Sequence, residues 1–162
     1  MAASEAGIGL GSNIGDKAGN IREAVRRLCA DGRVRLTALS PIYRTPPWGP
    51  VRQDFFANAC ALVRTAMEPL DLLDLAKSIE AEMGREQTVR WGPRLIDIDI
   101  LFHGHHTLAG GRLTLPHPEL FNRAFVLVPL AEIAPELQIG GRSVRAAARA
   151  TPDEGIIVWD GR

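Results

Sequence analysis

Two aspartates stand two residues apart in an otherwise apolar segment, Leu95 to Phe102. Because side chains alternate along a strand, Asp97 and Asp99 would share one face, while the three isoleucines and Phe102 would share the core face. Residues two apart on a strand place their Cβ atoms roughly 7 Å apart, and two like charges at that separation are stabilised by a cation between them. The pair can therefore hold one or two Mg²⁺ ions against polyphosphate oxygens.

Basic residues lie just upstream of this acidic pair. Arg85 and Arg90 precede a stiff turn, Trp91-Gly92-Pro93, and Arg94 follows the turn directly before the predicted strand. A bare Asp-x-Asp would be interpreted as a solvated strand face that discourages aggregation. Arginines beside a Mg²⁺-binding pair instead supply the charge neutralisation and positioning that phosphoryl transfer needs. The combination favours an enzyme that handles polyphosphate.

The remaining residues that could bind a metal have simpler interpretations. His103, His105 and His106 lie in a turn-rich connection and lack a neighbouring carboxylate, so we interpret them as a solvated turn in preference to a metal site. Cys29 and Cys60 sit inside apolar patterns without metal-ligand spacing. They indicate reduced core cysteines of a cytosolic protein.

The rest of the chain alternates between strand and helix patterns. The spacing predicts a strand at 8–10, a helix capped by Asp16, strands at 34–43 and 55–65, a helix with Pro69 in its first turn, a strand at 95–102 and a return strand at 113–115. In the second strand, Val34, Leu36 and Ala38 are expected to share a face. The apolar segment 125–134 is helical or partly strand. This order predicts an α+β ferredoxin-like sandwich, with an antiparallel-rich central sheet flanked by helices and extra C-terminal elements.

Composition bounds the class of protein. The chain has 162 residues, 46% of them hydrophobic, with 19 basic and 19 acidic side chains. Balanced charge gives no field that would draw the molecule onto nucleic acid. No apolar stretch approaches the ~20 residues of a membrane helix, and the first residues lack the pattern of a secretion signal. We expect one domain over 1–162, a cytoplasmic monomer with small-molecule substrates and neither nucleic-acid nor membrane partners.

The segment Arg90 to Leu101 resembles the signature of the 6-hydroxymethyl-7,8-dihydropterin pyrophosphokinase family of the folate pathway. Other motifs of that family follow in the right order over most of the chain: Gly11-Ser12-Asn13, Tyr43-Arg44-Thr45-Pro46-Pro47, Gly49-Pro50, Asn58, Leu115-Pro116-His117, and Asn122-Arg123 with Phe125. The resemblance implies the ferredoxin-like fold. It also implies transfer of pyrophosphate from the co-substrate ATP to the pterin hydroxymethyl group, giving AMP and the dihydropterin diphosphate.

The resemblance further implies roles for single residues. Asp97 and Asp99 match the pair that holds two Mg²⁺ ions between ATP and the pterin hydroxyl, whose pKa the metal would lower. Arg85 and Arg94 match arginines that act on the triphosphate during transfer. The positions that match contacts to ATP are Lys77, Glu80, Arg90, Trp91, Ile100, His117 and Arg123.

The pterin pocket implied by the resemblance consists of Thr45, Pro46, Pro47, Trp48, Phe56, Asn58 and Phe125. A flat bicyclic ring suits aromatic faces, here Phe56 and Phe125, although plain core packing is the alternative for both rings. Asn58 lies inside an apolar strand, where a buried amide needs partners. Its side chain is therefore the strongest candidate for the polar edge of the ring.

Three other functions are weighed against this one. The chain lacks the G-x-x-x-x-G-K-[ST] loop, which excludes a P-loop kinase. A nucleotidyltransferase would place a Gly-Ser pair and an acidic pair much closer together than Gly11-Ser12 and Asp97 are. The alternative of a different class is a non-enzymatic ferredoxin-like module that binds RNA or a small regulator. Balanced charge and the lack of strand-borne aromatic RNA-binding motifs count against that module.

Overall fold

The computed structural model describes residues 2–47, 49–84, 95–153, 155–159 and 161. The larger elements are β1 (Ser4–Ser12), α1 (Lys17–Leu28), β2 (Val34–Leu39), β3 (Tyr43–Thr45), β4 (Phe56–Thr65), α2 (Pro69–Glu82), β5 (Asp97–His103) and α3 (Ala124–Ile133). The shorter ones are β6 (Leu108–Ala109), β7 (Thr114–Leu115), the 3₁₀ helix η1 (Leu120–Asn122), β8 (Gln138–Ile139), β9 (Arg142–Ser143), α4 (Val144–Ala150) and β10 (Ile157–Val158).

One antiparallel sheet organises the molecule. Its strands lie in the order β10-β3-β4-β1-β5, and β2 pairs with β4. β2 lies beside residues 61–65 of β4, while β3 lies beside residues 56–58. If β2 and β3 are counted as one interrupted strand, the order β-α-β-β-α-β and the pairing are those of a ferredoxin-like sandwich, so the predicted fold class is confirmed.

The second predicted strand, 34–43, is wrong as a continuous element. The hydroxyl of Ser40 accepts a hydrogen bond from the Cys60 backbone N–H at 3.0 Å, in place of a strand carbonyl. Pro41 follows and has no N–H to donate. The expected alternation also fails, because the register shifts between Leu36 and Ala38: Val34 belongs to the core beneath α1 and α2, whereas Ala38 packs against the core on the opposite face. The ladder therefore stops at Leu39 and resumes at Tyr43 as β3.

The two long predicted helices begin where the sequence indicated. Asp16 accepts a hydrogen bond from the Gly19 N–H at 3.1 Å and caps α1. Pro69 occupies the first turn of α2. Of the two interpretations of segment 125–134, the helical one is confirmed by α3. Among the described residues, no helix has both the length and the apolar character to cross a bilayer.

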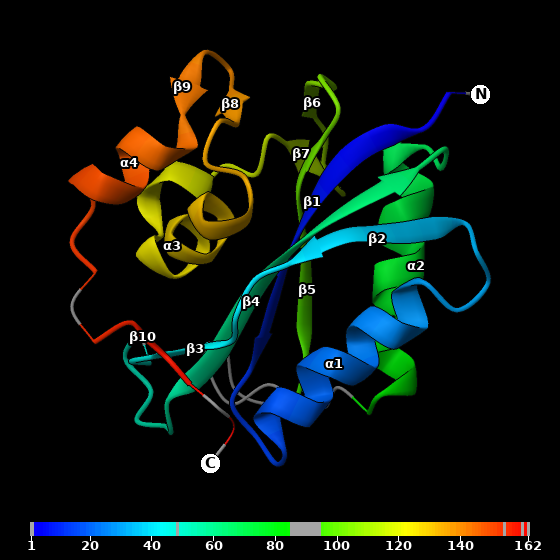
Figure 1. Ribbon diagram of the computed structural model, residues 1–162. Coiled ribbons are helices and arrows are strands. Elements are labelled where there is room, and N and C mark those ends of the chain that lie inside the picture. The colour runs from blue at the N-terminus through cyan, green and yellow to red at the C-terminus, as the bar shows by residue number, and fades with distance from the viewer. Residues whose placement is uncertain (1, 48, 85–94, 154, 160, 162) are drawn as a thin grey trace.

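The sheet separates two apolar cores (Figure 1). One core packs beneath α1 and α2 and includes Ile96, Ile98 and Ile100; the other packs beneath α3 and α4 and includes Leu101 and Phe102. Phe102 was expected to share the face of the isoleucines, and this is wrong. Ile8 pairs with Ile100, but its neighbour Gly7 pairs with Phe102, so Leu101 is an extra residue that turns Phe102 to the opposite face.

His103 also departs from its prediction as part of a solvated turn. It is the last residue of β5, is 2% exposed, and places its Nε2 2.8 Å from the Met67 carbonyl oxygen. His105 and His106 are exposed as expected. A histidine becomes buried here because β5 runs one residue further than the sequence indicated, along the partner strand β1.

Candidate active site

Several of the predicted site residues lie on one face, at the end of the sheet where β1 leads toward α1. The strand register aligns two rows across that face. The first row is Tyr43, Asn58, Gly11 and Asp97, and the second is Cys60, Gly9 and Asp99. Asn58 and Asp97 thus lie on either side of Gly11, although 39 positions separate them in the chain.

Glycines form the floor between these side chains. A Cβ built on Gly11 would lie 2.8 Å from the Asn58 amide oxygen, and one built on Gly9 would lie 3.8 Å from the Asp99 Cβ. Only hydrogen atoms project from β1 at these two positions. The middle of the face is therefore low, with the amide on one side and the two carboxylates on the other. The alternating glycines of β1 are a signal that the sequence prediction used only in part.

Asn58 is held in one orientation. Its Nδ2 donates a hydrogen bond to the Thr45 hydroxyl at 2.7 Å, and both side chains are buried. The Thr45 hydroxyl in turn donates to the Phe56 carbonyl oxygen at 3.5 Å. These contacts link three residues of the predicted pterin pocket, and they leave the amide oxygen of Asn58 directed over Gly11. Pro46 and Pro47 follow Thr45 and are exposed.

The segment of β5 that bears the carboxylates is fixed from its outer edge by α2. The Glu80 side chain is 4% exposed, and its Oε2 accepts a hydrogen bond from the Ile98 backbone N–H at 2.9 Å. Lys77, one turn earlier, donates to Glu80 Oε1 at 3.3 Å. Glu80 therefore binds the backbone of the residue that lies between Asp97 and Asp99. Asp99 is exposed and Asp97 half-buried.

His117 belongs to the same region. Its backbone N–H donates to the Leu101 carbonyl oxygen at 2.8 Å, and its Nδ1 accepts the Glu119 backbone N–H at 3.1 Å. Burial lowers the pKa of His117, and the negative charge of Asp99 opposes that shift. Since Nδ1 is an acceptor, the neutral ring carries its proton on Nε2. The site thus contains a fixed N–H donor near a carboxylate.

Arg123 and Phe125 come from the start of α3 and the residue before it. The Arg123 guanidinium lies 5.6 Å from the centroid of the Phe125 ring, and its positive charge helps to lower the pKa of His117. Both side chains are half-buried, as is Phe56. Partial exposure lets each ring present a face to a ligand, and the Phe125 ring also packs against the core beneath α3 and α4.

Other predicted residues are placed differently. The side chain of Ile100 is buried in the core, so only its backbone could contact a nucleotide. Cys60, which was not predicted as a site residue, lies on the site face and donates to the Val126 carbonyl oxygen at 3.5 Å. Five of the predicted positions fall outside the described residues: Trp48, Arg85, Arg90, Trp91 and Arg94.

The carboxylate pair is a chemically suitable magnesium site. Mg²⁺ is commonly bound through one or two carboxylates and retains positions for water and phosphate oxygens. Among the described residues, no group of three or more His, Cys, Asp or Glu side chains could enclose a metal. Asp97 and Asp99 are two carboxylates on one strand face, which agrees with a metal held jointly by protein and substrate.

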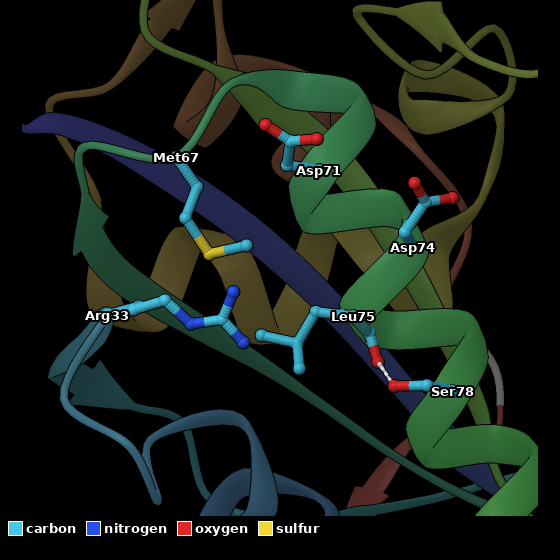
Figure 2. Close-up of a pocket in the computed structure, with 6 residues that line it drawn as sticks. All are labelled: Arg33, Met67, Asp71, Asp74, Leu75 and Ser78. Carbon is cyan, nitrogen blue, oxygen red and sulfur yellow. Dashed lines mark hydrogen bonds between the residues drawn. The ribbon is translucent and has the colours of Figure 1, made fainter.

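The cavity shown in Figure 2 lies elsewhere. It has a volume of about 520 Å³ and is lined by Arg33, Met67, Asp71, Asp74, Leu75 and Ser78. Arg33 and Met67 adjoin the Val34–Thr65 pair at one end of the sheet. Asn58 and Asp97 lie at the opposite end, where both pair with Gly11. None of the predicted site residues that the structure describes lines this cavity, and Asp74 is engaged by Arg112.

Comparison with known proteins identifies the family. The model of the 7,8-dihydro-6-hydroxymethylpterin-pyrophosphokinase family matches residues 7–135. A protein of Methylorubrum extorquens named 2-amino-4-hydroxy-6-hydroxymethyldihydropteridine pyrophosphokinase is 51% identical over 149 residues, which are 92% of this chain and 94% of that protein. A protein of the same name from Bacillus subtilis is 41% identical over 94% of this chain and 88% of its own length.

Solved structures agree at the level of the fold. The crystal structure of Plasmodium falciparum HPPK-DHPS with pteroate superimposes with a TM-score of 0.73 at 17% identity, covering 91% of this chain. The present chain spans 42% of that longer one. The extent of the family match, the identity with relatives of similar length and the shared fold lead to one conclusion: the chain belongs to the 7,8-dihydro-6-hydroxymethylpterin-pyrophosphokinase family.

Proposed function

We propose that this chain catalyses the reaction of its family with ATP as donor and two Mg²⁺ ions as cofactors. Pyrophosphate would pass from ATP to the hydroxymethyl group of 6-hydroxymethyl-7,8-dihydropterin, giving AMP and the dihydropterin diphosphate for folate synthesis. The observation that carries the proposal is the first row of the site face, where Asn58 and the acidic strand face each other across Gly11. A cytoplasmic location and a monomeric state stay predictions.

The amide side of this row suits the pterin. Asn58 offers its oxygen as an acceptor for the ring's N–H groups, while its Nδ2 is fixed on Thr45. Phe56 and Phe125 are half-buried, so each can present a ring face. A pterin held here would direct its hydroxymethyl group across the glycine floor toward β5.

The acidic side suits the phosphates. Magnesium held by Asp97 and Asp99 would neutralise phosphoryl charge and lower the pKa of the pterin hydroxyl. His117, protonated on Nε2, can donate a hydrogen bond to a phosphate oxygen, and Arg123 adds a positive charge. No side chain in the described part of the site would be required as a general base, because bound magnesium would make the hydroxyl acidic enough to give its proton to water. Catalysis then consists of positioning and charge neutralisation.

The product distribution tests the proposal. Incubation with ATP, Mg²⁺ and 6-hydroxymethyl-7,8-dihydropterin should release AMP in equal amount to the dihydropterin diphosphate, as measured by chromatography. ADP would indicate single phosphoryl transfer, and the absence of both nucleotide products would favour a binding module. Chelation of Mg²⁺ should abolish AMP formation, and AMP formed at full rate in a chelator would contradict the metal assignment.

The two aspartates can be tested separately from the reaction type. Asp97→Asn and Asp99→Asn keep the size of each side chain and remove its charge, so each should lower kcat by about a thousandfold or more with little change in thermal unfolding. Asp71→Asn on the exposed side of α2 is the matched control, and it should leave kcat unchanged. Normal turnover in either site variant would contradict the assignment of that residue.

A further inference from the structure

The strand β10 lies beyond the region that the family model matches, residues 7–135, yet it contacts the part of the chain that carries the predicted pterin pocket. Ile157 pairs with Arg44 and Val158 with Tyr43. The Trp159 N–H donates to the Ile42 carbonyl oxygen at 2.8 Å. Figure 1 shows β10 beside β3, at the same end of the sheet as the candidate site. β10 therefore covers the outer edge of β3, whose inner edge pairs with β4.

The Trp159 side chain extends this contact to the loop between β3 and β4. Its ring meets the Phe55 ring edge-on, with centroids 5.2 Å apart. Lys17 Nζ lies 3.9 Å from the Phe55 ring centroid and the Arg44 guanidinium lies 4.1 Å from it. Phe55 is thus surrounded by groups from α1, β3 and the C-terminal segment, and it directly precedes the predicted pocket residue Phe56.

The same loop is anchored at neighbouring positions. Lys17 forms an ion pair with Asp54 at 2.8 Å, and the Asn13 amide donates to the Gln53 side chain at 2.8 Å. Near the other end of the loop, a Cβ built on Gly155 would lie 3.3 Å from Pro46 Cδ. The backbone of the C-terminal segment therefore lies directly against a second residue of the predicted pocket.

We propose that Trp159, together with β10, positions the β3–β4 loop for pterin binding. Trp159 is a positioning residue that acts through Phe55 and β3 and makes no contact with substrate in this scheme. The predicted pocket residues stand at both ends of the loop, so its conformation determines how Pro46 and Phe56 are placed relative to Asn58. This inference rests on the proposed function for the identity of the ligand, but the loop contacts themselves do not depend on it.

The test compares three variants. Trp159→Ala removes the ring contact and Trp159→Phe retains an aromatic ring. Val158→Ala shortens a side chain that is 65% exposed and keeps the backbone pairing by which β10 contacts β3. Loss of an aromatic pair of this kind would weaken the interaction that holds the loop by roughly three- to tenfold, and pterin affinity with it. We expect Trp159→Ala to raise the KM for the pterin by that factor, with the KM for ATP nearly unchanged. The melting temperature should fall as well, because the Trp159 ring also packs against the core beneath α1 and α2. Trp159→Phe should recover most of the affinity, and Val158→Ala should behave as wild type.

Hydrogen exchange supplies a readout that needs no turnover. In the protein without ligands, Trp159→Ala should accelerate amide exchange in residues 51–56 and leave β1 unchanged. Unchanged exchange in 51–56 together with an unchanged pterin KM would overturn the inference, as would an equal rise in both KM values. If the wild-type chain forms no AMP, the proposed function fails, and the exchange data alone then decide whether Trp159 holds the loop.

Discussion

Three glycines on one face of β1 provide a graded test of the site geometry. A Cβ built on Gly7 would overlap a ring carbon of Phe102, whereas one on Gly9 would lie 3.4 Å from the nearest atom, a Leu101 methyl group. On Gly11 the nearest atom is the Asn58 amide oxygen at 2.8 Å. The same substitution, glycine to alanine, should therefore have three different consequences at positions two residues apart.

The expected magnitudes follow from what each methyl group would displace. In Gly11→Ala the methyl group would displace the Asn58 amide oxygen from the place where it accepts the pterin N–H, and losing that hydrogen bond costs about 1–3 kcal/mol of binding free energy. That corresponds to roughly a five- to 150-fold loss of pterin affinity. Gly7→Ala must displace a packed ring, which costs about 1–3 kcal/mol of folding free energy. Gly9→Ala meets ordinary contact distances and gains up to about 1 kcal/mol from lower chain entropy in the unfolded state.

Two assays separate these outcomes. Calorimetry with the pterin and a non-hydrolysable ATP analogue should show weakened binding chiefly in Gly11→Ala. Thermal unfolding should show the largest fall in Gly7→Ala, at about 2–4 °C per kcal/mol. Gly9→Ala is the comparison variant. It should unfold much like wild type and weaken pterin binding less than Gly11→Ala, because its nearest neighbours are Leu101 and Asp99 and not the Asn58 amide. The reasoning is refuted if Gly9→Ala weakens pterin binding as much as Gly11→Ala, or if Gly11→Ala binds pterin normally.

Three further predictions concern groups around the site. Glu80→Ala leaves the Ile98 N–H without its acceptor, so it should lower both kcat and the free energy of unfolding, the latter by about 1–3 kcal/mol. Glu80→Gln keeps an acceptor and should lose much less of both quantities. Chemical denaturation and steady-state kinetics measure them, and equal losses in the two variants would contradict the role of the hydrogen bond. Burial lowers the pKa of His117, so as the pH drops below about 6.5 the unfolded chain takes up a proton before the folded chain does, and the free energy of unfolding should fall. His117→Asn should make the free energy of unfolding depend less on pH in denaturation series between pH 7.5 and 5.5. An unchanged pH dependence would contradict the role of His117. Burial, reinforced by the charge of Asp99, strongly raises the pKa of the Cys60 thiol. Iodoacetamide at pH 8 should therefore leave Cys60 unmodified until the protein unfolds, as measured by mass spectrometry. Rapid modification of the folded protein would show that the thiol is accessible.

The local features of the fold could be predicted because short-range chemistry sets them. Asp16 caps α1 with a side chain three residues from its donor, and Pro69 begins α2 because its ring suits the first turn. Strand alternation placed Asp97 and Asp99 together, and separated them from the isoleucines, through backbone geometry alone. Motif order over most of the chain then indicated the family that the comparisons identify.

Other features depend on a partner strand or helix that no local pattern reveals. The break at Ser40 arises because its hydroxyl bonds to Cys60, twenty residues away, and the extra residue Leu101 arises from the register with β1. His103 is buried because β5 continues along β1 beyond the expected boundary. Glu80 was expected to face the nucleotide, but its carboxylate bonds to the Ile98 backbone; whether it also contacts ATP stays a prediction.

The sequence by itself determined the chemistry that this chain can offer: a pair of carboxylates on a strand, a buried amide in a second strand, and helices that begin at Asp16 and Pro69. Only the tertiary structure decided where these groups meet. The antiparallel register of β1 with both β4 and β5 aligns Asn58, Gly11 and Asp97 in one row, and the pairing of β10 with β3 brings Trp159 to Phe55. Such contacts join residues far apart in the chain, and their free energy comes from pairing and packing that exist only once the sheet has assembled.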